Sequence, residues 1–194
     1  TPQQIEKLMP YGLKLATHHT NATGTLNRYP ECRSACVDET ALYNPEIYTE
    51  LICAKVGIHV DPYMLRLVRK IKGDDRIILI SDAYACDGPI PPGYDDVFDI
   101  NFDHTGEIAG SKMTLDIACA NMMKHTGASI VNVFQFASYN PARAVGFYDR
   151  GEIAVGKRAD LVMVDYKMNI QKVILKGELQ WELRHITHIH LPEE

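Results

Sequence analysis

The chain has 194 residues, 46% of them hydrophobic, and a formal net charge of −5. This length and composition predict one globular domain, or a piece of a larger one. Without a cluster of lysine and arginine, the negative charge argues against a nucleic-acid or acidic-membrane surface. No apolar run approaches the ~20 residues that a spanning helix needs, and no signal segment opens the chain.

The number and spacing of the cysteines indicate the redox environment of the protein. There are five, an odd number without CxxC spacing, which favours reduced thiols in a cytoplasmic protein over a disulfide framework. Cys32 and Cys36 could share a helix face, but two thiols without a nearby Cys/His pair make a weak case for zinc. The chain begins at Thr1 rather than at Met, so we expect either that something was removed or that this is a portion of a longer polypeptide.

The first elements lead to a pair of histidines. Thr1 to Gln4 has the form of a helix start, Pro10 to Gly12 ends that helix, and residues 13–16 are a short strand candidate. A histidine after a strand, here His18 or His19, can offer an imidazole nitrogen to a metal. A surface or structurally satisfied pair is the alternative. Residues 23–31 are polar and predict a loop, in which Arg28 is either solvated or a phosphate ligand.

The middle of the chain alternates strand and helix signals. Residues 46–53 form a short helix or strand, and the helical spacing of residues 64–71 ends at Gly73. Residues 77–80, all large aliphatics, predict a strand buried on both faces. Asp82 follows at the carboxyl end of that strand, where α/β folds place ligands and catalysis. The alternative for Asp82 is an ordinary turn residue.

The last third changes in character after residue 148. Before that point the sequence predicts a Gly/Pro-rich loop over 87–93 and a β-ribbon over 97–102 with a turn at 105–106. It also predicts helices over 113–124 and 129–137 and a third, short helix that starts at Pro141. Afterwards it predicts strands within 151–165 and at 170–175, with a hairpin turn at 176–178. We therefore divide the chain into 1–148, 149–182 and a tail, 183–194, whose histidines (His185, His188, His190) favour a free terminus over a metal site.

Several motifs in this order resemble the second half of the N-acetylglucosamine-6-phosphate deacetylases of the amidohydrolase superfamily. The segments that carry the resemblance are Thr17-His18 with Asn21-Ala22, Val56-Gly57-Ile58-His59-Val60, Ile80-Ser81-Asp82-Ala83, Ile108-Ala109-Gly110-Ser111 with Thr114, Asn140-Pro141-Ala142-Arg143, and Gly156-Lys157 with Ala159-Asp160-Leu161. The last two are shared with many amidohydrolases. The resemblance covers residues 1–182, and it lies in the ordered combination rather than in any single motif.

The resemblance implies an α/β fold, the C-terminal part of a (β/α)8 TIM-type barrel followed by strands of a small β-sandwich domain. It implies a hydrolase that removes the acetyl group from a sugar phosphate with a divalent metal, zinc or iron. His18 is then a metal ligand, and Asp82 is the general base that takes a proton from the activated water and returns it to the leaving amine. The remaining metal ligands would be supplied from outside this chain.

The resemblance also implies the substrate contacts. His59 would hydrogen-bond the substrate, while Asn21, Ala22 and Arg28 would hold the phosphate. The other pocket residues would be Val56, Gly57, Ile58, Ile108, Ala109 and Gly110. In the family the phosphate arginine can come from the partner subunit, which implies a homodimer of the full-length protein.

The chain departs from the family pattern in ways that leave alternatives open. Val56 replaces an aspartate, which makes a galactosamine-type substrate credible. His19 and Thr20 replace an apolar and an aromatic residue, and the loop to Arg28 is about one residue short against the family, so Arg33 is a second candidate for the phosphate. A cyclic-amide hydrolase or D-aminoacylase is disfavoured by Asn21-Ala22 and Arg28, and the rival outside enzymes is a non-catalytic remnant. We expect the 194-residue chain alone to be inactive.

Overall fold

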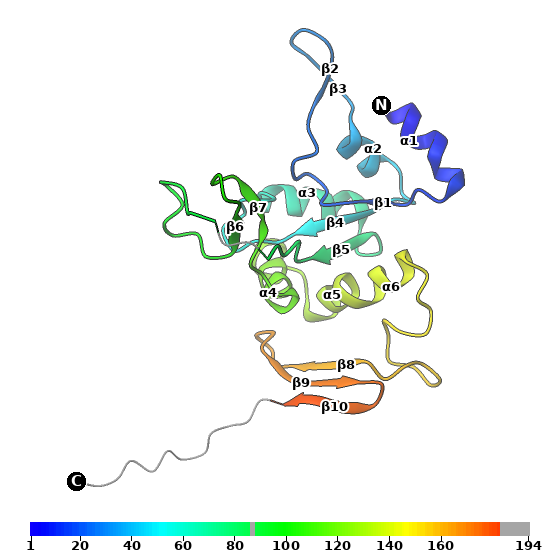
Figure 1. The fold of residues 1–194 in the computed structure, drawn as a ribbon. Helices are drawn as coiled ribbons and strands as arrows, with labels where there is room; N and C mark the ends of the chain where they lie inside the picture. Colours follow the sequence, from blue (N-terminus) through cyan, green and yellow to red (C-terminus); the bar gives the residue numbers. More distant parts are fainter. Residues whose placement is uncertain (86–87, 183–194) are drawn as a thin grey trace, which may run out of the picture.

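The computed structural model describes residues 1–85 and 88–182. Its helices and strands follow the chain in the order shown in Figure 1. The helical segments are α1 (Pro2–Leu8), the 3-10 turn η1 (Met9–Tyr11), α2 (Val37–Tyr43), α3 (Pro62–Lys72), α4 (Leu115–Thr126), α5 (Ile130–Phe134), the π-helix η2 (Gln135–Tyr139) and α6 (Asn140–Ala144). The strands are β1 (Leu15–Ala16), β2 (Leu26–Tyr29), β3 (Cys32–Ser34), β4 (Tyr48–Ile52), β5 (Ile77–Ile80), β6 (Ile100–Phe102), β7 (Ile108–Ser111), β8 (Leu161–Val164), β9 (Ile170–Leu175) and β10 (Glu178–Glu182).

A parallel sheet of order β1-β4-β5 forms the centre. β4 pairs with β5 in the register Thr49↔Ile77 to Ile52↔Ile80, and α3 makes the crossover between them. The sequence fixes both ends of α3: the Asp61 side chain accepts a hydrogen bond from the Tyr63 amide at 2.6 Å, and Gly73 with φ 65° ends the helix. The predicted βαβ organisation of this region is confirmed.

The two faces of the sheet contribute to different clusters. Leu51, Cys53, Ile77 and Leu79 pack with the buried side chains of α3, α4 and the helical segment 130–144. Ile52 and Ile80, on the opposite face, pack with residues from the segment that contains β6. Strand residues buried on both faces explain why 77–80 is apolar without alternation.

The segment 130–144 runs as one continuous helical stretch with a π turn in its middle. The short helix predicted at Pro141 is present as α6, which has Pro141 in its first turn and follows η2 without a break. Proline has no amide hydrogen to donate to the preceding turn, and a π turn is one way in which a helix accommodates such a loss. The π turn (Gln135–Tyr139) ends one residue before Asn140. The side-chain amide of Asn140 donates to the Asp74 and Ile77 carbonyls at 2.8 and 2.7 Å, so the helix is fixed to the start of β5.

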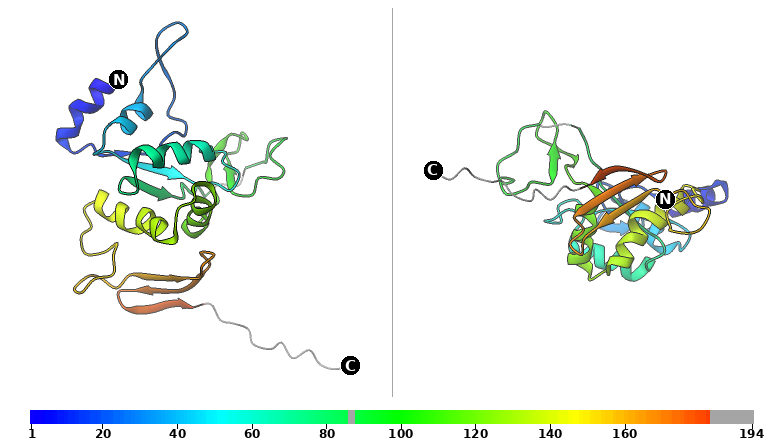
Figure 2. Two further views of the ribbon diagram at one scale, coloured as in Figure 1. Left: turned by 180° about the vertical axis from the view of Figure 1, so that it is seen from behind. Right: turned by 90° about the horizontal axis from the view of Figure 1, so that it is seen from below.

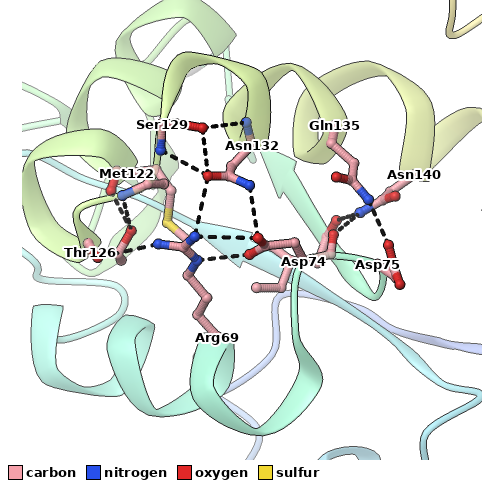
Figure 3. Close-up of polar contacts among 11 residues, drawn as sticks. Arg69, Asp74, Asp75, Met122, Thr126, Ser129, Asn132, Gln135 and Asn140 are labelled. Atoms are coloured by element: carbon pink, nitrogen blue, oxygen red, sulfur yellow. Dashed lines mark hydrogen bonds and ion pairs between the residues drawn. The ribbon is translucent and has the colours of Figure 1, made fainter.

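A polar network joins α3 to the helices at the amino end of β5 (Figure 3). Arg69 donates from Nε to the Asp74 carboxylate at 2.8 Å, and the Asn132 side chain donates to the same carboxylate at 2.8 Å. Arg69 also donates to the Thr126 carbonyl at 3.3 Å. These groups lie at the amino edge of the parallel sheet, away from the carboxyl edge where α/β folds bind ligands, and they hold the helices to the sheet.

Two excursions leave the body of the molecule (Figure 1). The hairpin β2–β3 projects between β1 and α2, and the predicted loop over 23–31 is therefore wrong in part because residues 26–29 form a strand. Cys32 lies in β3 and Cys36 is the N-cap of α2, so the two thiols do not share a helix face. The second excursion is the antiparallel pair β6–β7, which confirms the predicted ribbon and lies at the carboxyl end of β5.

Strands β8, β9 and β10 form a separate antiparallel sheet of order β10-β9-β8. It lies on the far side of α4–α6 from the parallel sheet (Figures 1 and 2). The hairpin turn between β9 and β10 confirms the prediction, but Ile153 and Val155 lie in no strand. The tail histidines lie outside the described residues. Among the residues that are described, no helix has the length and apolarity to cross a membrane.

Candidate active site

The carboxyl ends of β1, β4 and β5 meet at one edge of the parallel sheet, and the residues singled out from the sequence follow these ends. His18 comes two residues after β1, His59 comes after β4, and Asp82 comes two residues after β5. Asp82 is exposed and has a φ of 49°. Asp is one of the few residues that tolerate this left-handed conformation, so the backbone turns at Asp82 and presents its carboxylate at the edge.

Strand β7 crosses the end of β5 and fixes Asp82. The Ser111 amide donates to the Asp82 carbonyl at 2.8 Å, and the Tyr84 amide donates to the Ser111 carbonyl at 3.2 Å. The contact is so close that a Cβ on Gly110 would lie 2.5 Å from the Asp82 carbonyl oxygen. Gly110 therefore has a steric reason to be glycine, and the segment 108–110 lies beside the candidate base.

His59 is 5% exposed, and neither of its ring nitrogens has a hydrogen-bond partner among the described residues. Burial lowers the pKa of His59, and the nearby Asp82 carboxylate, the Gly110 backbone and the Asp99 carboxylate oppose that shift. A buried imidazole held in its neutral form keeps one donor and one acceptor nitrogen. Such a group suits hydrogen bonding to a neutral amide or hydroxyl.

The loop that carries His18 has several residues in left-handed conformation. His18, Thr20 and Ala22 have φ values of 34°, 64° and 50°. Nδ1 of His18 lies 2.8 Å from the Asn21 carbonyl oxygen; a carbonyl oxygen only accepts, so Nδ1 is the donor, and in the neutral tautomer with that hydrogen Nε2 has the lone pair. The side-chain amide of Asn21 donates from Nδ2 to the His59 carbonyl at 3.2 Å. The loop therefore ties the end of β1 to the segment after β4.

Glu50 is a site residue that the sequence argument missed. It lies in β4, its carboxylate interacts with the His18 backbone, and burial raises its pKa, with the Asp82 charge raising it further and the His18 contacts lowering it. A glutamate directly before the apolar pair Leu51-Ile52, inside a strand whose other residues are buried or half-buried, is the signal that could have indicated an inward-facing polar group. Two carboxylates, Glu50 and Asp82, therefore share this edge with His18 and His59.

The other residues predicted to line the substrate pocket lie in the loop 56–59 and in the segment 108–110. Gly57, with φ 74°, could not carry a side chain, because its Cβ would lie 2.4 Å from Cδ of Pro62. Ile58 packs beside the cluster that contains Ile52, while Val56 and Ile108 are exposed and Ala109 is half-buried. The structure thus brings the segments 56–59 and 108–110 to the edge where Asp82 lies.

The phosphate candidates differ in what the structure says of them. Arg28 lies in β2, and its side chain is outside the described atoms. Arg33 forms an ion pair with Glu39, so it is already engaged. Asn21 and Ala22 lie in the loop after β1.

The described part of the chain contains no group of three His, Cys, Asp or Glu side chains arranged to hold a metal ion. His18 by itself fits a ligand, because a histidine ligand usually donates its other ring N–H to a carbonyl or carboxylate, as Nδ1 does here to Asn21. One nitrogen does not make a catalytic site, which takes three protein ligands. The described residues therefore do not by themselves assemble a catalytic metal site.

Comparison with known proteins places this edge in a family context. N-acetylglucosamine-6-phosphate deacetylase of Lysinibacillus sphaericus is 30% identical over 188 residues, covering 93% of this chain and 47% of that protein. The enzyme of the same name from Bacillus subtilis is 28% identical, covering 84% of this chain and 43% of that protein. The chain thus spans about half the length of these relatives. A putative N-acetylgalactosamine-6-phosphate deacetylase of Escherichia coli K12 is 29% identical and is covered over 96% of its length.

Solved structures give the same picture. The crystal structure of N-acetylglucosamine-6-phosphate deacetylase from Thermotoga maritima superposes with a TM-score of 0.77 at 27% identity, covering 94% of this chain and 51% of that one. These matches confirm the α/β fold as the C-terminal part of a TIM-type barrel. The model of the amidohydrolase family matches residues 44–179, and the chain belongs to the amidohydrolase family.

Proposed function

We propose that the protein carrying this chain hydrolyses the acetamide of an N-acetylated amino-sugar phosphate, with N-acetylglucosamine-6-phosphate as the first candidate. The observation that supports this most is the convergence of Asp82, His59 and His18 at the carboxyl edge of β1, β4 and β5. The deacetylases to which the chain is similar add the substrate class.

The proposed roles follow from the geometry. The chemistry that a divalent metal, zinc or iron, supplies in such hydrolases is an activated water nucleophile. His18 would contribute one nitrogen ligand to the metal through Nε2, and the other ligands of the metal would come from residues outside those described. Asp82 would accept a proton from the attacking water and return it to the sugar nitrogen as the C–N bond breaks, which yields acetate and a free amine. Buried, neutral His59 would hydrogen-bond the acetamide or a sugar hydroxyl.

The phosphate would lie at the loop after β1. Asn21 and Ala22 belong to that loop, and Arg28 belongs to the hairpin that projects from it. An arginine on a projecting hairpin can reach a neighbouring subunit, so a homodimer in which Arg28 meets the partner's substrate is part of the proposal.

N-acetylgalactosamine-6-phosphate is the second candidate. Val56 stands 49% exposed at the active edge where the resemblance expects an aspartate, and the loss of a carboxylate beside the sugar changes which hydroxyl is recognised. N-acetylgalactosamine-6-phosphate deacetylases are also among the similar proteins, at 29% identity.

The test is an amine-release assay on the protein expressed from its complete coding sequence. N-acetylglucosamine-6-phosphate and its galactosamine epimer would each be compared with the unphosphorylated sugar, before and after chelation and zinc or iron add-back. We expect metal-dependent turnover of one phosphorylated sugar. Absence of turnover on all these sugars, from a folded and metal-loaded protein, would favour the non-catalytic alternative.

A further inference from the structure

One side chain outside the edge described above contacts the loop that carries His18 at three points. Asp38, in the first turn of α2, accepts a hydrogen bond from the Thr20 amide at 3.2 Å and from the Thr23 hydroxyl at 2.6 Å. Its Oδ1 also lies 3.2 Å from Nδ1 of His19. Burial, which raises the pKa of Asp38, is outweighed by these His19, Thr23 and Thr20 contacts, so the net shift is downward.

His19 is the inner partner of this contact. It is 0% exposed, and neither of its ring nitrogens makes a geometrically good hydrogen bond among the described residues. Nδ1 therefore meets Asp38 as a close polar contact at 3.2 Å, and Nε2 meets no such group. A buried nitrogen without a partner costs free energy, so an apolar residue of similar size would fill this space at a lower cost. What the imidazole adds at this position is the contact with Asp38.

The contacts lie on both sides of the hairpin β2–β3. Thr20 and Thr23 precede β2, while Asp38 follows β3. Asp38 therefore closes the base of the hairpin, and it holds the loop at the residues that flank Asn21 and Ala22. The loop needs such support because three of its non-glycine residues have positive φ, a conformation that L-residues adopt only when their surroundings hold it.

We propose that Asp38 and His19 form a positioning pair that fixes the 17–24 loop and the base of the β2–β3 hairpin for catalysis. This rests on the proposed function: the pair orients His18 through the loop and, through Thr23, orients the hairpin that carries Arg28. Neither Asp38 nor His19 touches the substrate.

Hydrogen exchange tests the positioning without any assay of activity. In Asp38→Asn, the Thr20 amide loses a charged acceptor, and bonds to charged groups are the stronger ones, so we expect exchange in peptides covering 17–24 to become about tenfold faster or more. Amides of α3 should be unaffected. Glu39→Gln is the matched control, because Glu39 lies in the same helical turn but bonds Cys36 and Arg33 instead of the loop.

Two further variants test the two proposed roles separately: Thr23→Val tests the hold on the hairpin, and His19→Leu tests the hold on the loop at His18. In the protein from the complete coding sequence, Thr23→Val should raise KM for the phosphorylated sugar about threefold or more with kcat nearly unchanged. His19→Leu should lower kcat and weaken zinc binding, measured by competition with a chelator, while the fold is kept because leucine fills the space.

The outcomes are distinguishable from failure of the proposed function. If the wild type hydrolyses none of the sugars, the proposed function fails, and the exchange experiment still decides whether Asp38 holds the loop. Equal exchange in Asp38→Asn and Glu39→Gln would overturn the positioning pair. So would a wild-type KM in Thr23→Val together with wild-type kcat and zinc affinity in His19→Leu, whatever the thermal stability of the two variants.

Discussion

Gly110→Ala is the sharpest test of how the end of β5 is built. An added Cβ would lie 2.5 Å from the Asp82 carbonyl oxygen and 3.1 Å from Cβ of Tyr84. Real Cβ atoms essentially never come within 3.0 Å of such atoms, so β7 and the Asp82 turn must separate by at least 0.5 Å, from 2.5 to 3.0 Å. Both neighbours are held by the Ser111–Asp82 hydrogen bond, and they cannot move apart independently.

The expected cost has two parts. A non-glycine residue at the φ of 81° costs about 1–2 kcal/mol, and the overlap costs about 1–3 kcal/mol, as in other overpacked sites. Gly110→Ala should therefore lower the free energy of unfolding by about 2–5 kcal/mol. Gly156→Ala is the matched control, because Gly156 has a φ of 83° with no atom within 4 Å of the added Cβ. It should cost only the conformational part, about 1–2 kcal/mol.

Urea unfolding of both variants measures the difference, and steady-state kinetics measures its effect on Asp82. We expect kcat of Gly110→Ala to fall roughly tenfold to 100-fold, because a displacement near 1 Å of a catalytic group has effects of that order, while Gly156→Ala keeps wild-type kcat. If the two variants agreed in stability to within about 0.5 kcal/mol and in kcat, the close packing of β7 on Asp82 would be refuted.

Four further predictions address the site, the network and the core. Asp82→Asn keeps a side chain that tolerates positive φ and should lower kcat about 10²–10⁴-fold; retention of more than about a tenth would remove Asp82 as the base. Arg28→Ala should raise KM for the phosphorylated sugar by about one to two decades and leave the unphosphorylated analogue unaffected, whereas equal effects would move the phosphate role to Arg33. Asp74→Ala removes the acceptor of Arg69 and Asn132 and should lower the free energy of unfolding in urea by about 1–3 kcal/mol. Asp75→Ala is the control and should lower it less, because its exposed carboxylate accepts only from Gln135 among the described residues. A larger loss of stability in Asp75→Ala would contradict the network. Burial raises the pKa of the Cys53 and Cys119 thiols from 9.0 to about 12. Between these values the unfolded chain loses protons that the folded chain keeps, so stability falls as pH rises. In the Cys53→Ala/Cys119→Ala variant the urea midpoint should therefore fall less than in the wild type between about pH 8 and about pH 10.5, and the same fall in both proteins would show that the thiols are not buried.

The sequence was most informative where one local signal decided the structure. The apolar run 77–80 is a buried strand because both of its faces pack. The helix predicted over 64–71 is α3, which ends at Gly73 as expected and begins two residues earlier, at Pro62. The position of Asp82 after the apolar run indicated the carboxyl edge from the residues alone, whereas the grouping of His18 and His59 with it was implied by the family resemblance. Parallel strands place their carboxyl ends together.

The misses have a different cause, because they depend on partners far away in the chain. Glu50 becomes a site residue only through the register of β4 against β5 and the loop at His18. Asp38 meets the Thr20 amide 18 residues away, which no local pattern reports. β2–β3 lacks an alternating apolar face, so its polar residues indicated a loop.

The Asn140 amide bonds, which fix the start of β5, have a consequence for folding during synthesis. Asn140 and Ile77 are 63 residues apart, and a ribosome adds about 5–20 residues per second. The start of β5 therefore spends about 3–13 s without these bonds while the chain is made. During that interval β5 and β4 are the exposed apolar strands of a nascent chain, so the period before Asn140 emerges is the one in which chaperone binding to this segment would protect it most.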